Sequence, residues 1–293
     1  MTQISRPVLI LGLSTAALLL GAAGVVSDLA SLAMANDTVS HTIAVPAVVA
    51  VLLYWNRQAI LASGGTSRLG MLAGVVLVVA GLGLATATHA AQSSYDALML
   101  DVFGVVVAWY GLFVACLGGG AVRAALFPLA FLLLAVPIPT VVLDGATRFL
   151  KDGSTEAVAG LFSLTGTPFL REGYVFHLPG TAIEVADECS GIRSSIGLLL
   201  TSLLAGHMYL RRGWSMVALV ATVLPVVILK NGVRIVVLSI LAIRVDPGYL
   251  TGQLHHEGGV LIFLLALVLL APVLMVLRRV ETPTVPIPMA QRT

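Results

Sequence analysis

The sequence is poor in charge. Only 10% of its 293 residues are charged, whereas 58% are hydrophobic. So few charges cannot cover the surface of a soluble domain, which excludes a soluble globular protein. The sequence also lacks an extended basic face with interleaved aromatic residues, which excludes nucleic acid as a partner. The composition therefore predicts an integral membrane protein surrounded by a lipid bilayer.

Cysteine is scarce as well. The 2 cysteines, Cys116 and Cys189, are too few for a disulfide framework. Cys116 lies near the end of an apolar run that finishes at Arg123, and Cys189 lies at the start of a run that finishes at Arg211 and Arg212. If both basic groups face the cytoplasm, the two sulfur atoms lie at opposite membrane faces, beyond bridging reach. Cys189 is therefore predicted to be a free thiol.

Long apolar runs dominate what is present. Each is long enough to cross about 30 Å of hydrocarbon as a helix. They cover residues 8–27, 38–55, 70–88, 97–117, 124–143, 190–210, 214–244 and 259–277. The sequence thus predicts an all-α integral membrane protein with about eight transmembrane helices. Because no internal repeat or linker interrupts it, residues 1–293 are predicted to form a single multi-pass domain.

The distribution of charge predicts the orientation of these helices. With the N-terminus inside, nine arginines fall on the cytoplasmic side, and the acidic residues of the connecting segments, from Asp28 to Glu257, fall outside. The arginines are Arg6, Arg57, Arg68, Arg123, Arg211, Arg212, Arg278, Arg279 and Arg292. Both termini are therefore predicted to be cytoplasmic.

One sizeable segment outside the spans, residues 144–188, precedes the sixth run on the predicted outer side. Its first part mixes apolar and charged residues, as in an amphipathic helix that lies in the membrane interface. Its second part alternates at Tyr174, Phe176 and Leu178 and then reaches Pro179-Gly180, which predicts a short hairpin.

Three polar clusters interrupt the last third of the chain: DECSGIRSS at 187–195, KNGVR at 230–234 and HHEGG at 255–259. Ionisable groups within or next to a span are costly, so each cluster is a candidate functional site. Cys189 is predicted at the outer N-terminus of the sixth helix, where the helix dipole favours a thiolate. Arg234 lies about one membrane thickness beyond Arg212, and His255 and His256 lie in the next outer loop.

Each cluster also has a simpler interpretation. Cys189 could be a small apolar residue at a helix start, Lys230 a side chain that snorkels to the interface, and His255 a solvated loop residue. Together, however, a thiol, a guanidinium and an imidazole at one membrane face can perform acyl transfer.

Competing chemistries match the sequence less well. HHEGG lacks the second histidine of a zinc-protease motif, and no other potential ligands have a suitable spacing, so neither a metal nor another cofactor is predicted. Ser190, Ser194 and Ser195 do not fit the GxSxG pattern. A transporter or channel, with Arg234 and outer-face acidic residues along a pathway, remains the alternative from another class; a non-enzymatic scaffold for polysaccharide assembly is a third.

The three clusters resemble the signature of the exosortase/archaeosortase family of membrane cysteine enzymes. The resemblance runs from FLLLAVPIP through REGYVFHLPGTAIEVADECSGIRSS and NGVRIVVLSIL to HHEGGVLIF, and it implies a catalytic core over 124–277. It implies that Cys189 is the nucleophile, Arg234 the arginine of N-x-x-R and His255 the catalytic histidine, with His256 as the other register. Asn231, Glu188 and Ser190 are candidate supporting residues, whereas Arg193 is predicted to be structural.

The resemblance also implies a substrate. Members of this family recognise C-terminal sorting tails made of a short motif such as Pro-Glu-Pro, a transmembrane helix and a basic end. They cleave the tail and in some cases transfer the new carboxyl group to an acceptor, which the sequence does not identify. A bacterial inner membrane with a periplasmic active site is the implied location.

Overall fold

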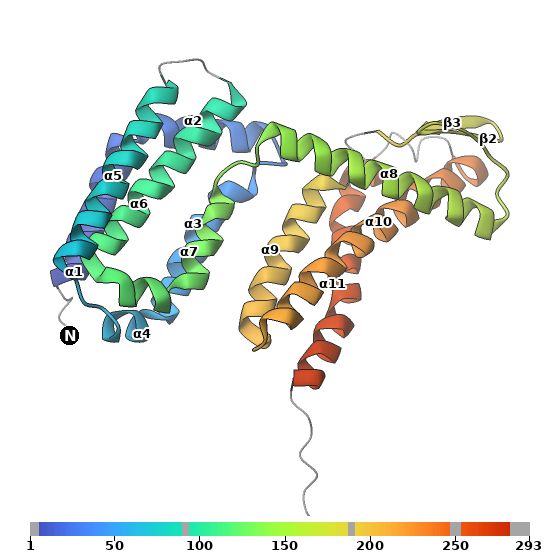
Figure 1. The fold of residues 1–293 in the computed structure, drawn as a ribbon. Helices are drawn as coiled ribbons and strands as arrows, with labels where there is room; N and C mark the ends of the chain where they lie inside the picture. The colour runs from blue at the N-terminus through green and yellow to red at the C-terminus, as the bar shows by residue number, and fades with distance from the viewer. Residues whose placement is uncertain (1–5, 90–93, 187–190, 247–252, 282–293) are drawn as a thin grey trace, which may run out of the picture. The chain divides into compact units, whose positions relative to one another are not determined.

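The computed structural model describes residues 6–89, 94–186, 191–246 and 253–281, with residues 87–89 and 253–262 described by their backbone alone. The chain divides into two compact units, residues 1–143 and 144–293. The fold is predominantly helical, as the sequence predicts, and Figure 1 shows its elements.

The first unit is made of helices. They are α1 (Arg6–Gly21), α2 (Ala23–Ala35), α3 (His41–Trp55), α4 (Arg57–Ala62), α5 (Arg68–His89), α6 (Tyr95–Ala124), α7 (Leu126–Leu132) and the 3-10 turn η1 (Leu133–Ala135). Two predicted spans are bent here: α1 and α2 meet at 72°, and α7 with η1 meets the next helix at 88°. The runs 8–27 and 124–143 are therefore not straight helices.

Helices α5 and α6 pack with their backbones almost in contact. A Cβ atom added at Gly81 would lie 2.4 Å from the carbonyl oxygen of Gly104, and one added at Gly74 would lie 2.6 Å from that of Gly111. Such an approach is possible only where both helices present glycine, and it is a common packing mode of membrane helices. The paired glycines therefore fix how α5 and α6 pack.

The second unit contains all but the first four residues of α8 (Thr140–Thr165), then a small sheet and three helices. These are β1 (Leu170–Glu172), β2 (Val175–Leu178), β3 (Thr181–Glu184), α9 (Ile192–Tyr209), α10 (Gly213–Arg244) and α11 (Gln253–Glu281). The predicted hairpin is confirmed: Leu178 pairs with Thr181 around Pro179-Gly180. Strand β1, which pairs antiparallel with β2, was not predicted.

The sheet packs against both α8 and α10. Phe176, Ile183 and Val185 form one buried cluster with Val158 of α8 and Val236 of α10. Helix α8 buries one face only, as an amphipathic helix should, and it crosses the middle part of α10 near Ile228 and Gly232 (Figure 1).

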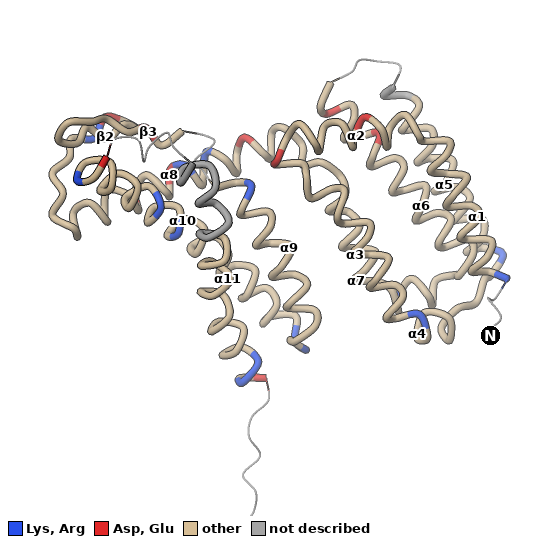
Figure 2. Tube along the Cα trace, turned by 180° about the vertical axis from the view of Figure 1, so that it is seen from behind, with Lys and Arg blue, Asp and Glu red and all other residues tan. Residues whose placement is uncertain are grey.

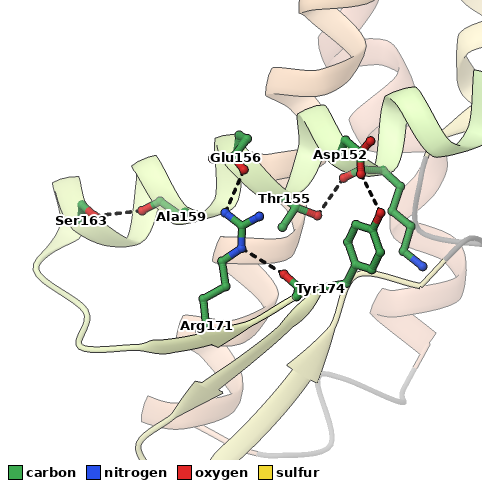
Figure 3. Close-up of polar contacts among 9 residues, drawn as sticks. Asp152, Thr155, Glu156, Ala159, Ser163, Arg171 and Tyr174 are labelled. Atoms are coloured by element: carbon green, nitrogen blue, oxygen red, sulfur yellow. Dashed lines mark hydrogen bonds and ion pairs between the residues drawn. The ribbon is translucent and has the colours of Figure 1, made fainter.

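Polar contacts on the rim of this cluster tie the sheet to α8, as Figure 3 shows. The Tyr174 hydroxyl donates to Asp152 Oδ1 at 2.6 Å, and Arg171 Nη1 lies 2.9 Å from Glu156 Oε1. The hydrogen bond to the Asp152 carboxylate raises the pKa of Tyr174, because loss of its proton would remove the donor and place two negative charges together.

Several helices are suited to a membrane. By length and composition α5, α6, α10 and α11 could each cross it, which gives four spans, or up to six if each of the two bent pairs counts as one. Helix α3 is apolar but has only 15 residues. These features confirm that the protein is a helical membrane protein with several spans. The expected number of eight transmembrane helices stays a prediction.

Candidate active site

The predicted site residues come from three segments of the second unit. Cys189, Glu188 and Ser190 lie outside the described residues. Asn231 and Arg234 lie in α10, and His255 lies in α11, where the backbone alone is described. The arrangement is therefore built here from Asn231, Arg234 and the residues that flank the cysteine.

Gly191, two residues after Cys189, lies directly against α10. It caps α9 with a left-handed backbone (φ 82°), which glycine adopts without strain. A Cβ atom built on it would lie 3.4 Å from Val227 Cγ1 and 3.6 Å from Asn231 Cγ. The chain that leaves the cysteine segment therefore passes close to the asparagine of N-x-x-R.

The chain that enters the cysteine segment also packs on α10. Val185 is fully buried in the cluster that contains Val236, and its N–H donates to the carbonyl oxygen of Tyr174 at 3.0 Å. The residues on the two sides of 187–190 thus pack against one stretch of α10, from Val227 to Val236. This stretch contains Asn231 and Arg234.

Asn231 is a buried connection between α10 and α8. Its side chain is 1% exposed, and Nδ2 donates to Ser154 Oγ at 3.1 Å. A Cβ atom added at Gly232 would lie 2.9 Å from Ala157 Cβ, so α8 crosses α10 closely at this point. The α8 crossing therefore covers Asn231 and limits its side chain to a fixed position.

Lys230 is buried next to the start of α9. The residue is only 5% exposed, and its Nζ donates to Ser194 Oγ on the first turns of α9. Ser194 Oγ in turn donates to the carbonyl oxygen of Gly191 at 2.9 Å. The Lys230 side chain therefore lies against the first turns of α9, in a buried polar cluster.

Arg234 lies one helical turn after Lys230, on the same side of α10. It is half-buried, and its positive charge acts on the Lys230 ammonium. The sequence pointed to Arg234 and Asn231 but missed Lys230. The signal that could have identified Lys230 is its spacing from these two residues. Asn231 follows it directly, and Arg234 lies four residues further along the same helix.

The histidines lie in a helix and not in a loop, which corrects the sequence interpretation. Helix α11 begins at Gln253, so His255 and His256 belong to its first turn. Helices often extend beyond the apolar run that identifies them, because polar residues can continue the backbone hydrogen bonds outside the hydrocarbon.

The comparison with protein families agrees with these segments. A family model described as transmembrane exosortase matches residues 30–272, which is most of the chain. The chain belongs to the transmembrane exosortase family. The searches of the curated proteins and of the solved structures found no match. The resemblance noted in the sequence is therefore confirmed at the level of the family.

An exosortase is, at a general level, a membrane sorting protease or transpeptidase of the cysteine-peptidase kind that acts on protein substrates with sorting signals. Among the described residues of this exosortase, no group of three or more His, Cys, Asp or Glu side chains could hold a metal ion.

Lys230, Ser194, Asn231 and Ser154 form the polar cluster of this exosortase. It lies at one end of the bundle made by α9, α10 and α11. At the other end Glu281 accepts hydrogen bonds from the backbone N–H groups of Arg211 and Arg212, at 2.7 and 2.9 Å, and Arg278 lies over the Tyr209 ring. Figure 2 shows basic residues at these ends of α9 and α11. Lys230 is 18 residues beyond Arg212, about 27 Å along the helix, so the two ends are about a membrane thickness apart.

Proposed function

We propose that this exosortase is a thiol protease or transpeptidase that cleaves C-terminal sorting tails at the outer face of the membrane. Cys189 is its nucleophile, and Arg234 and His255 are its other catalytic residues. The observation that carries the proposal is the close approach of Gly191 to Asn231, where an added Cβ atom would lie 3.6 Å from Asn231 Cγ, because it brings the chain next to the cysteine close to the helix that bears Arg234.

The chain length between these residues limits how far apart they can be. Cys189 is two residues from Gly191, and two extended residues span at most about 7 Å. A Cβ atom built on Gly191 would lie 3.6 Å from Asn231 Cγ, and Asn231 is three residues, less than one turn, from Arg234. We propose that the Cys189 thiol and the Arg234 guanidinium act on one substrate peptide bond.

The proposed reaction uses these groups in two steps. The Cys189 thiolate attacks the scissile carbonyl carbon, the Arg234 guanidinium stabilises the oxyanion, and the His255 imidazolium gives a proton to the leaving amine. A thioester forms and the peptide C–N bond breaks. Water or an acceptor amine then attacks the thioester and restores the thiol.

The position of the site suits a membrane-anchored substrate. A tail with a short motif, a transmembrane helix and a basic end presents its motif just outside the membrane when its basic end is inside. The polar cluster lies at the end of the bundle opposite Arg211, Arg212 and Arg278, where such a motif would arrive. We propose a bacterial inner membrane with this end on the periplasmic side.

Three further residues are proposed to support the site. Asn231 orients the start of α9 through its contact with Gly191 and is itself held by Ser154. Glu188 and Ser190 flank the nucleophile in sequence and are proposed to shape the loop around it.

The test follows the size of a tagged reporter protein with such a tail, co-expressed with the enzyme. We expect Cys189→Ala to abolish processing, and Arg234→Ala and His255→Ala to slow it by about 100-fold or more, because each removes a proton-transfer or oxyanion-stabilising group. His256→Ala, tested in parallel, decides between the two histidines.

Cys116→Ala is the matched control, because this thiol lies in α6 of the other unit and has no role in the proposed reaction. Its processing should equal that of the wild type. Full processing by Cys189→Ala, at wild-type abundance in the membrane, would rule out the proposed mechanism.

A further inference from the structure

Strand β3 lies at one side of the sheet and pairs with β2 alone, because the strand order is β1-β2-β3. The N–H of Val185, just after β3, donates to the carbonyl oxygen of Tyr174, just before β2. In an antiparallel pair only alternate residues form hydrogen bonds with the neighbouring strand, so Ile183 also bonds toward β2. The N–H and C=O groups of Ala182 and Glu184 therefore point to the free edge of β3.

This edge is open, and the strand that carries it is fixed in place. Ala182 and Glu184 are exposed, and within the described part of the chain nothing forms a hydrogen bond to their edge-facing groups. Ile183 and Val185 between and beside them are buried in the cluster that contains Val236. The edge thus presents two N–H and two C=O groups at a fixed spacing, an arrangement that an added strand completes.

The edge also lies near the proposed nucleophile along the chain. Glu184 is five residues before Cys189, so at most about 18 Å of chain separates them. The sheet packs on α10 at Val236 and Ile240, which follow Arg234 toward the proposed outer end of this helix. The free edge of β1, in contrast, belongs to the strand that follows α8 and is separated from β3 by β2.

We infer that the free edge of β3 is the docking site of the sorting tail, whose short motif binds there as an extended strand. This inference rests on the proposed function. Ala182 and Glu184 exchange main-chain hydrogen bonds with the tail, and these bonds set its register independently of its side chains. The four residues of β3 match a short motif. The transmembrane helix of the tail cannot pair in this way, because its own N–H and C=O groups are bonded within the helix.

The experiment traps the bound tail by disulfide cross-linking. The enzyme carries Cys116→Ser and Cys189→Ala, so that the tail stays uncleaved, together with Ala182→Cys or Glu184→Cys. The co-expressed reporter has a single cysteine that is moved along its tail, and isolated membranes are mildly oxidised. Opposed residues of paired strands have Cα atoms about 5.5 Å apart, which a disulfide can bridge, whereas the adjacent residues face the other side of the sheet. We expect each variant to cross-link at one tail position and not at its two neighbours, with the position for Glu184→Cys two residues from that for Ala182→Cys.

Leu170→Cys in the same background is the matched control. Leu170 pairs with His177, which pairs with Ala182, so it lies in the same row of the sheet, exposed like Ala182 but at the opposite edge. It should not cross-link. Equal cross-linking of adjacent tail positions, equal cross-linking by Leu170→Cys, or no cross-link from β3 would overturn the inference and leave the proposed function standing. If the parent reporter is not processed by the wild type, or is processed by Cys189→Ala, the proposed function itself fails.

A rate measurement tests one of the main-chain hydrogen bonds. Ala182→Pro removes the edge-facing N–H and none of the hydrogen bonds to β2, and proline is tolerated at such an edge position. Ala182→Val adds a side chain of similar size but keeps the N–H. At equal membrane abundance we expect Ala182→Pro to process the parent reporter about fivefold more slowly than Ala182→Val, which should match the wild type. Equal rates for the two variants would show that this N–H does not bind the tail and would contradict the inference.

Discussion

At the scale of single residues, Gly191 links the cysteine segment to helix α9. Its φ of 82° lies in the left-handed region, and its carbonyl oxygen accepts hydrogen bonds from Ser194 Oγ, Ser195 Oγ and the Ser195 N–H. A methyl group would meet Val227 at 3.4 Å, an ordinary contact distance. Substitution by alanine should therefore introduce backbone strain without a steric clash.

For Gly191→Ala we predict a loss of about 1–2 kcal/mol in the free energy of unfolding, the usual cost of a left-handed backbone for a residue with a Cβ atom. Thermal unfolding in detergent measures the loss. Gly173→Ala is the matched control, because Gly173 has a φ of 63° and nothing within 4 Å of an added Cβ. Both variants should lose similar stability, but Gly191→Ala alone should slow tail processing. Equal processing by the two would show that the start of α9 does not position the site.

Local sequence features predicted the polar residues of the candidate site but not their burial. The N-x-x-R spacing puts Asn231 and Arg234 on one side of a helix, which is a local property. The burial of Asn231 depends on α8, whose small residues Gly153 and Ala157 let it cross α10 closely. That crossing joins residues more than 70 positions apart, so nothing in the sequence near Asn231 indicates it.

At the scale of elements, the alternation of apolar residues and the Pro179-Gly180 turn predicted β2 and β3. Strand β1, the bend between α1 and α2, and the start of α11 were not predicted. Strand β1 has only three residues, all exposed, and therefore shows no alternation. The bend of 72° between α1 and α2 falls within one continuous apolar run. The hydropathy of such a run does not show whether its helix is straight or bent. The start of α11 was predicted too late because its first turn is polar.

The α5 and α6 pair allows a test of an element-scale contact. Leucine at position 81 would force its Cβ to within 2.4 Å of the Gly104 carbonyl oxygen, so the helices would have to separate. We predict that Gly81→Leu greatly lowers the abundance and thermal stability of the purified protein, since overpacking at a backbone contact costs several kcal/mol or prevents folding.

The matched control is Gly83→Leu in the same helix, where an added Cβ has nothing within 4 Å. It changes hydrophobicity and helix propensity in the same way but should leave abundance near the wild-type level. Comparable losses in the two variants would indicate that helix propensity or insertion, and not the contact with Gly104, determines the result.

At the scale of the whole molecule, the orientation in the membrane decides whether the site can meet its substrate. In the second unit, Arg211, Arg212, Arg278 and Glu281 gather at one end of the bundle, and the polar cluster lies at the other. The excess of basic residues predicts that the first end is cytoplasmic. The cysteine segment should then be exposed on the outer side.

Single-cysteine variants and a membrane-impermeant maleimide test this orientation in spheroplasts. With Cys116→Ser, the remaining Cys189 should be labelled from outside, because α9 begins at that end. With both native cysteines replaced by serine, Gly213→Cys, at the exposed start of α10 beside Arg212, should be labelled only after the membrane is permeabilised. Labelling of Gly213→Cys in intact spheroplasts would reverse the orientation and place the polar cluster on the cytoplasmic side, where a tail with a cytoplasmic basic end presents no motif.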